Sequence, residues 1–138
     1  MNDLQRRFNA TNATRARFFD KPFDWSKSAT CVHMLRFHAA QMGHDMPMVP
    51  EFRTAIGAKK ALKGMGWDSI EEMMNHFFVP ITPAFMLTGD IMAVPGDAGF
   101  SALMVRGSVD KFLGWHQDAE GCTVLASDMA SATGAWRL

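Results

Sequence analysis

A cysteine stands where a helix is expected to begin, within the stretch "FDWSKSATCVHMLRFHAAQMGH" from Phe23 to His44. Ser26 or Ser28 could cap this helix, because serine side chains bond the free amides of a helix start. A helix N-terminus carries a partial positive charge and unbonded N–H groups, which lower the pKa of a thiol and can hold an oxyanion. Only the thiolate is a nucleophile. Cys31 is therefore either a nucleophile at a helix N-terminus or a small apolar residue packed in a core.

A nucleophilic cysteine also needs a histidine within hydrogen-bond reach, usually oriented by a third polar group. His33 follows the cysteine by two positions and points to a different side of the helix. His38 shares the face, but at about 1.5 Å per residue it lies roughly 10 Å along the axis, too far for proton transfer. His44 follows the helix and His76 lies on a later one, so both are expected as surface or cap residues. His116 is the remaining candidate for the partner.

Length and composition indicate one folded domain over residues 1–138. The chain has 138 residues, of which 48% are hydrophobic and 20% charged, as in ordinary globular proteins. Lys+Arg and Asp+Glu both number 14, which argues against a dedicated nucleic-acid binder. A basic cluster near the start is expected to be a solvated or partner-facing helix surface rather than a nucleic-acid patch; it consists of Arg6, Arg7, Arg15 and Arg17.

The cysteine count and hydropathy exclude several other classes. Cys31 and Cys122 cannot form a disulfide framework and match no zinc spacing, so no metal or cofactor is expected. Cys122 is expected in the core, and Asp90 as a turn residue that bonds its own backbone before a strand. No apolar run nears about 18 residues, and no signal peptide is visible. We therefore expect no membrane span and synthesis in a cytoplasm.

The hydrophobic pattern divides the chain into a helical half up to about residue 78 and a strand-rich half from about residue 90, which predicts an α+β fold. Residues 1–22 form an N-terminal helical arm in this prediction, with a weak middle at "NATNAT". The expected helices run from near Asp3 to near Phe19, from Ser26 or Ser28 to Gly43, from Glu51 to Lys63, and from Asp68 or Ser69 to before Pro80. The expected strands are Ile91–Val94, Ser101–Gly107, a hairpin of "KFLGWHQ" and "CTVLAS", and a last strand in "GAWRL".

Four motifs in this order carry a resemblance to a known family. They are "FDWSKSATC", "TAIGAKKALKGMG", "GDIMAV" and "AWRL". The sequence resembles the NlpC-type branch of the papain-like cysteine hydrolases. It is more closely similar to short phage and prophage domains of unknown function that are related to that branch and encoded among tail genes. The resemblance implies a helical half packed on a small antiparallel sheet.

The family resemblance also implies positions for the catalytic groups. Cys31 stands at the nucleophile position, but Thr30 replaces the aspartate that often precedes it. The family's histidine opens the strand after the Gly-Asp strand, and the aligned residue here is Ser101, or Phe100 with a one-residue slip. Neither accepts a proton near neutral pH. The family's third polar residue maps onto His116. The general base is thus missing from its expected place.

The function expected from these patterns is that of a structural part of a tailed-phage tail, at the tail tip or hub, with a degenerate hydrolase fold. It would be made in the host cytoplasm, stay in the virion and bind other tail proteins. One alternative is an active peptidoglycan peptidase or amidase that uses Cys31 and His116. Another is a tail assembly factor absent from the virion. We also expect the N-terminal arm, poorly anchored by itself, to dock on a partner through Phe8, Phe18 and Phe19.

Overall fold

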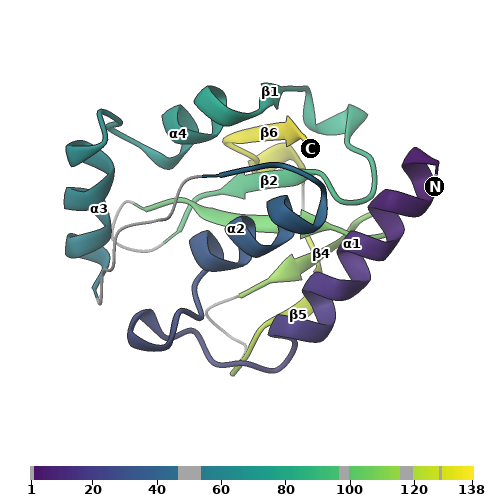
Figure 1. Ribbon diagram of the computed structural model, residues 1–138, viewed down its shortest axis with the longest axis horizontal. Coiled ribbons are helices and arrows are strands. Elements are labelled where there is room, and N and C mark those ends of the chain that lie inside the picture. Colours follow the sequence, from purple (N-terminus) through teal and green to yellow (C-terminus); the bar gives the residue numbers. More distant parts are fainter. Residues whose placement is uncertain (1, 47–53, 97–99, 116–119, 128) are drawn as a thin grey trace.

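The computed structural model describes residues 2–46, 54–96, 100–115, 120–127 and 129–138. Its α-helices are α1 (Asp3–Phe18), α2 (Cys31–Gln41), α3 (Ala55–Gly64) and α4 (Ile70–Phe77). Its strands are β1 (Val79–Pro80), β2 (Ile91–Val94), β3 (Ala102–Arg106), β4 (Lys111–Gly114), β5 (Thr123–Ala126) and β6 (Gly134–Arg137). They form a six-stranded antiparallel sheet in the order β1-β6-β2-β3-β4-β5 (Figure 1), which confirms the α+β prediction.

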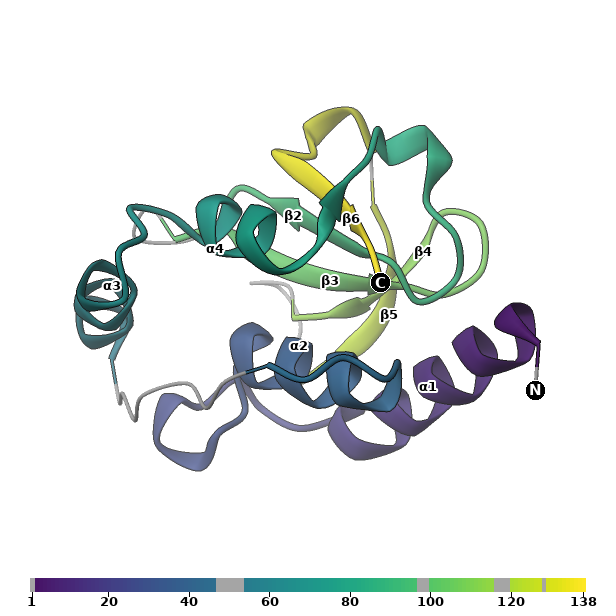
Figure 2. The ribbon, with the colours of Figure 1, turned by 45° about the horizontal axis from the view of Figure 1, so that its top comes forward.

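Side chains of the sheet alternate between two apolar layers, as expected from the pleat of a strand. Ile91 and Ala93 of β2, together with Leu103 and Val105 of β3, face the helical layer. Met92 of β2 and Met104 of β3 face the opposite side of the sheet. There they form a smaller apolar cluster with Met86 and Phe112. Helices α1 and α2 lie side by side below the sheet in Figure 2, while α3 stands at the far end of the molecule.

Helix α2 begins at the cysteine itself, later than the serines suggested. Trp25–Lys27 forms a 3-10 turn, and Asp24 and Ala29 exchange two backbone hydrogen bonds around it. Ser28 lies within this turn at φ 56°, whereas a capping residue needs extended backbone. Thr30 has that conformation, with φ −125° and ψ 167°, and its side chain accepts from the His33 N–H. The prediction of a cap at Ser26 or Ser28 was therefore wrong.

Helix α1 is continuous and firmly packed, which corrects two predictions. No break occurs at "NATNAT": the Thr11 hydroxyl donates to the Arg7 carbonyl four residues earlier, and Thr14 is buried. One side of the helix is buried, with Ala10 at 3% and Phe18 at 4% exposure. Phe18 is therefore unavailable as a docking anchor, and the helix does not need a partner to be held in place.

Other boundaries shifted by a few residues. Helix α3 starts after Thr54, whose side chain accepts from the Gly57 N–H. Helix α4 has the predicted cap, because the Ser69 hydroxyl accepts from the Glu72 N–H. The short strand β1 was not predicted; it pairs with β6 at the edge of the sheet. Two predicted turns fall partly outside the described residues, at positions 97–99 and 116–119.

Candidate functional site

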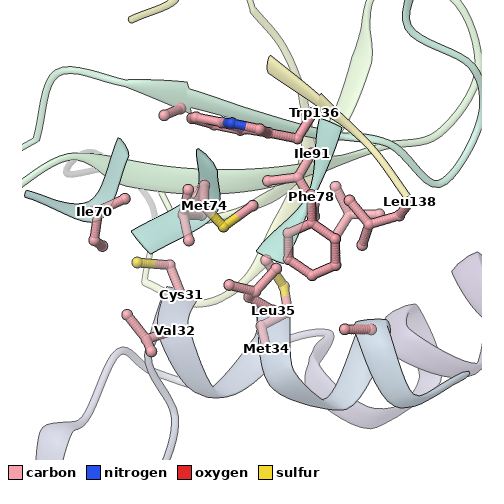
Figure 3. Packing of buried hydrophobic residues seen from close by; sticks show 14 of the residues in the cluster. Cys31, Val32, Met34, Leu35, Ile70, Met74, Phe78, Ile91, Trp136 and Leu138 are labelled. Atoms are coloured by element: carbon pink, nitrogen blue, oxygen red, sulfur yellow. The ribbon is translucent and has the colours of Figure 1, made fainter. Parts of the chain in front are cut away.

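Cys31 is the first residue of α2 and points into the core. Its side chain is only 6% exposed. In Figure 3 it projects from the start of α2 toward the layer that holds Ile70 and Met74, both of which belong to the same apolar cluster. Helix α2 packs on β3, so the predicted placement of the cysteine at a helix start against this sheet is confirmed.

The surroundings of the thiol act against ionisation. Burial raises the pKa of Cys31 above its ordinary value, because the charged thiolate loses its hydration. Hydrogen bonds from the backbone N–H groups of Leu103, Cys31 and Val32 oppose this effect but do not cancel it. The amides of a helix start are thus present, as the sequence suggested, yet the thiol stays protonated at neutral pH.

Ser101, at the expected base position, is bonded to an acidic residue. It directly precedes β3, on the strand side that also carries Leu103. The Ser101 hydroxyl donates to Oε1 of Glu71 on α4, and the Thr133 hydroxyl donates to the same oxygen at 3.0 Å. Burial tends to raise the pKa of Glu71, but these hydrogen bonds outweigh it and lower the pKa. The pair therefore ties α4 to the start of β3, and the residue at the expected base position is a hydroxyl that is already donating its proton to Glu71.

Four of the five histidines lie in the described part of the chain, and each has contacts of its own. Nδ1 of His33 lies 2.7 Å from the hydroxyl of the cap residue Thr30. His38 joins a buried polar chain beside α1. The rings of His44 and His76 pack against aromatic neighbours. None of these four described histidines is among the groups that shift the pKa of the thiol.

His116, the candidate partner of Cys31, lies outside the described residues, so the pair stays a prediction. The residue before it, Trp115, is described. Its indole N–H donates to the Lys21 carbonyl at 2.8 Å, and its ring packs edge-to-face on Phe18 and Phe23. Cys122 is completely buried, in agreement with the predicted core position, and burial raises its pKa to about 12.

A second group of chemically active side chains lies at the other end of α2, and the sequence did not reveal it. Asp90 is fully buried and accepts from Nη1 of Arg7 at 2.7 Å. Its second oxygen accepts from the Leu87 N–H, which is the local turn bond that was predicted. Arg7 also donates to the carbonyl of Leu138 at 2.9 Å and to Asp3 at 2.8 Å. We call this group the Arg7–Asp90 centre.

The Arg7–Asp90 centre corrects the interpretation of the N-terminal arginines. Arg7 is 4% exposed and does not belong to a solvated surface. Arg6 pairs with Asp3 and donates to the Met42 carbonyl. Arg15 and Arg17 are exposed, as expected. The Asp3–Arg7 spacing of four residues was the only local signal for this centre, because Asp90 lies 83 residues away from Arg7 in the sequence.

His38 continues this polar region between α1 and the turn before β2. The side chain is fully buried, with Nδ1 2.7 Å from the Thr14 hydroxyl and Nε2 2.8 Å from the Gly89 carbonyl. Since a carbonyl only accepts, Nε2 carries the proton and donates to it. Burial lowers the pKa of His38 to about 4, so the ring is neutral at physiological pH.

Within the described ranges, no three His, Cys, Asp or Glu side chains are grouped so that they could hold a metal ion. No helix in those ranges has the length and apolar character that crossing a bilayer requires.

The fold and the family can be compared with known proteins. None of the curated proteins matches the sequence. Among solved structures, NlpC2 from Trichomonas vaginalis is similar, with a TM-score of 0.60 and 13% sequence identity over 96% of this chain and 46% of that chain. This likeness confirms the NlpC-like fold, and the chain spans about half the length of that protein. A family model described as a domain of unknown function matches residues 2–138, so the chain belongs to the DUF6950 family.

Proposed function

We propose that this chain is a non-catalytic NlpC-like domain that serves as a structural component of a tailed-phage tail, at the tail tip or hub. The observation that carries the non-catalytic part is the closed nucleophile position. Cys31 is 6% exposed and its pKa is raised, and the expected base position holds Ser101, which is bonded to Glu71. A domain without a usable nucleophile acts through the surfaces that it presents to its neighbours.

The tail placement is supported by the motifs that resemble short phage and prophage domains encoded among tail genes. The proposed partners are other tail proteins, and the proposed location is the virion after synthesis in the host cytoplasm. Exposed apolar side chains favour a docking role: Leu4 is 71% exposed, Phe8 60% and Phe85 70%. A tail assembly factor that is absent from the finished particle would use the same surfaces.

A second candidate function, an active peptidoglycan peptidase or amidase, is favoured by one observation. Three backbone amides, those of Cys31, Val32 and Leu103, surround the thiol as an oxyanion site would. In that candidate His116 would be the base. The cavity beside Ser101 and Glu71 measures about 50 Å³, whereas pockets for organic ligands start at roughly 300 Å³. Cys31 does not line this cavity, so the cavity offers no substrate site at the thiol.

The test is Cys31→Ala in the phage or prophage that encodes the chain, with His116→Ala as a matched variant. We expect both phages to infect as well as the parent, and both purified proteins to release no peptides from peptidoglycan, just like the unmodified chain. The alanine at position 31 removes one buried sulfur atom, which costs about 1 kcal/mol of stability.

Proteomics of purified particles gives the second readout. The proposed function requires the chain in the particle, whereas an assembly factor would be found only in infected cells. If Cys31→Ala abolished infection while the variant folded and entered particles normally, the non-catalytic proposal would fail.

A further inference from the structure

The outer side of α1 carries a row of exposed side chains, which we call the α1 stripe: Leu4, Phe8, Arg15 and Phe19. On a helix with about 3.6 residues per turn, these positions lie within about 60° of one another. Leu4 is 71% exposed, Phe8 60% and Phe19 41%. Arg15 is exposed as well.

A neighbouring side of the same helix packs in the core, so the α1 stripe is not a core face that lacks its core. Arg7, Ala10, Thr14 and Phe18 are buried on that side. In Figure 2, α1 lies at the edge of the molecule beside α2, and its N-terminal part extends past the sheet. The stripe is therefore presented by a helix that its own domain already holds in place, which lowers the entropy cost of binding a partner.

Positive charge is concentrated at the C-terminal end of α1. The Arg15 guanidinium lies 5.2 Å from the centre of the Phe19 ring, and the Lys21 ammonium lies 6.0 Å from that of Phe18. Arg17 stacks in the same way on Phe37, at 5.9 Å. Within the part of the chain that the structure describes, no ion pair joins these three cations to a carboxylate. Arg15 is the one of these three cations that belongs to the α1 stripe, and its guanidinium remains available to an anionic group, whereas Arg17 lies on another side of the helix against Phe37 of α2.

We infer that the α1 stripe docks an acidic, amphipathic segment of a neighbouring protein, with apolar residues against Leu4 and Phe8 and a carboxylate against Arg15. A second copy of this chain fits less well, because its stripe carries no acidic residue. A nucleic acid would neutralise the cations but leave the two apolar side chains uncovered. This inference deepens the proposed function, since it names the partner chemistry of a docking domain.

The test replaces Phe8 with photoreactive benzoylphenylalanine in the full chain, expressed during infection, and identifies cross-linked peptides by mass spectrometry. The matched control carries the same group at Ile56, which is 69% exposed on α3 at the opposite end of the molecule (Figure 1). We expect the Phe8 position to cross-link to a peptide of a different protein that has net negative charge and apolar residues. The Ile56 position should not produce that peptide.

Two further variants, made in chains that carry the cross-linker at position 8, test whether the positive charge of Arg15 contributes to binding. Arg15→Glu should lower the cross-link yield at least about fivefold, because it sets like charges against each other, while Arg15→Lys should retain most of it. Cross-links to the chain's own peptides, to nucleic acid or to a segment without net negative charge would overturn the inference. So would a yield at Phe8 no higher than at Ile56, or a yield unaffected by Arg15→Glu.

The same samples separate this inference from the proposed tail function. A cross-link to an acidic segment in infected cells, with the chain absent from purified particles, would support the docking surface and remove the tail placement. A chain that is present in particles but gives no such cross-link would keep the tail placement and remove the docking surface.

Discussion

The two ends of α2 treat chemically active side chains in opposite ways. At the start of the helix, Cys31 lies among apolar side chains, and burial raises its pKa. None of the histidines in the described part of the chain acts on this pKa. At the other end, beside α1, Arg7 and Asp90 are just as buried but are joined by an ion pair and by hydrogen bonds to backbone groups. Cys31, which the family resemblance places at the nucleophile position, is packed in the hydrophobic core. The Arg7–Asp90 centre, which no sequence motif indicated, links α1 to the turn before β2 and to the C-terminal residue.

This difference shows why a kept motif does not by itself indicate a kept activity. A thiol can be buried without a partner at little cost, because it is a small and weakly polar group. A buried arginine or aspartate cannot, since an unpaired charge loses its hydration and gains nothing in return. A cysteine with no catalytic role would therefore be tolerated in the core, while the Arg7–Asp90 centre persists only if every partner is present.

The largest effect is expected from breaking the Arg7–Asp90 centre. Arg7→Met should lower the free energy of unfolding by about 3 kcal/mol, because the buried Asp90 carboxylate then keeps only Arg137, a partly exposed cation whose Nε lies 3.0 Å from it. Chemical denaturation measures this value. Arg17→Met is the matched control at an exposed position of the same helix and should change stability by less than about 0.5 kcal/mol. A loss below about 1 kcal/mol for Arg7→Met would mean that the centre is not a support of the fold.

The second-largest effect is expected on the pH dependence of stability, through the buried His38. The pKa of His38 is about 4 in the folded chain and 6.5 by its ordinary value, so the unfolded chain binds the proton more tightly. Stability should therefore fall as pH decreases from about 6.5 toward 4, by about 2 kcal/mol at pH 5 from this residue. Urea titrations of the unmodified chain and of His38→Gln at several pH values isolate the contribution of His38 to the pH dependence of the free energy of unfolding. The two proteins should differ in pH slope in that window; equal slopes would contradict a neutral, buried His38.

A smaller effect is expected at the position of the missing base. Ser101→Ala removes one of the hydroxyls that donate to Glu71 and should cost about 1 kcal/mol. Thr133→Ala removes the other donor and serves as the comparison. If Ser101→Ala stabilised the protein while Thr133→Ala destabilised it, Ser101 would not be acting as the tie between α4 and β3.

Ser101→His should have the smallest effect on activity. It places an imidazole at the expected base position but leaves the thiol covered by Ile70 and Met74. Peptide release from peptidoglycan should stay at background in this variant. Measurable release would show that the missing base is the only defect of the site.

The sequence predicted the parts of the fold that depend on local patterns. The strand Ile91–Val94, the hairpin of β4 and β5, and the cap at Ser69 follow from alternation, turn residues and capping chemistry. The start of α2 was misplaced because Ser28 adopts a left-handed backbone in a turn, which composition does not reveal. The contact between Thr14 and His38 joins two helices, so no spacing rule could have found it.

The candidate site was predicted in position, and the sequence left two characters open for Cys31, a nucleophile or a packed core residue; its burial agrees with the second. Resemblance placed Cys31 and Ser101 near the helix start and strand start where they are found. Whether a thiol is reactive depends on what covers it, and here the cover comes from α4, nearly 40 residues later in the sequence. Such a contact is set by tertiary packing and has no signature in the residues around the cysteine.

The reactivity of the Cys31 thiol tests the central claim most directly. Iodoacetamide alkylation of the native Cys122→Ala protein, followed by mass spectrometry, reports the thiolate of Cys31 alone as a function of pH. We expect alkylation at pH 7 to be at least about a hundredfold slower than that of the urea-unfolded chain, and the rate to keep rising with pH without an inflection up to the ordinary thiol pKa of about 8.5. Rapid alkylation at pH 7 with an inflection below that value would identify an activated nucleophile and contradict the account.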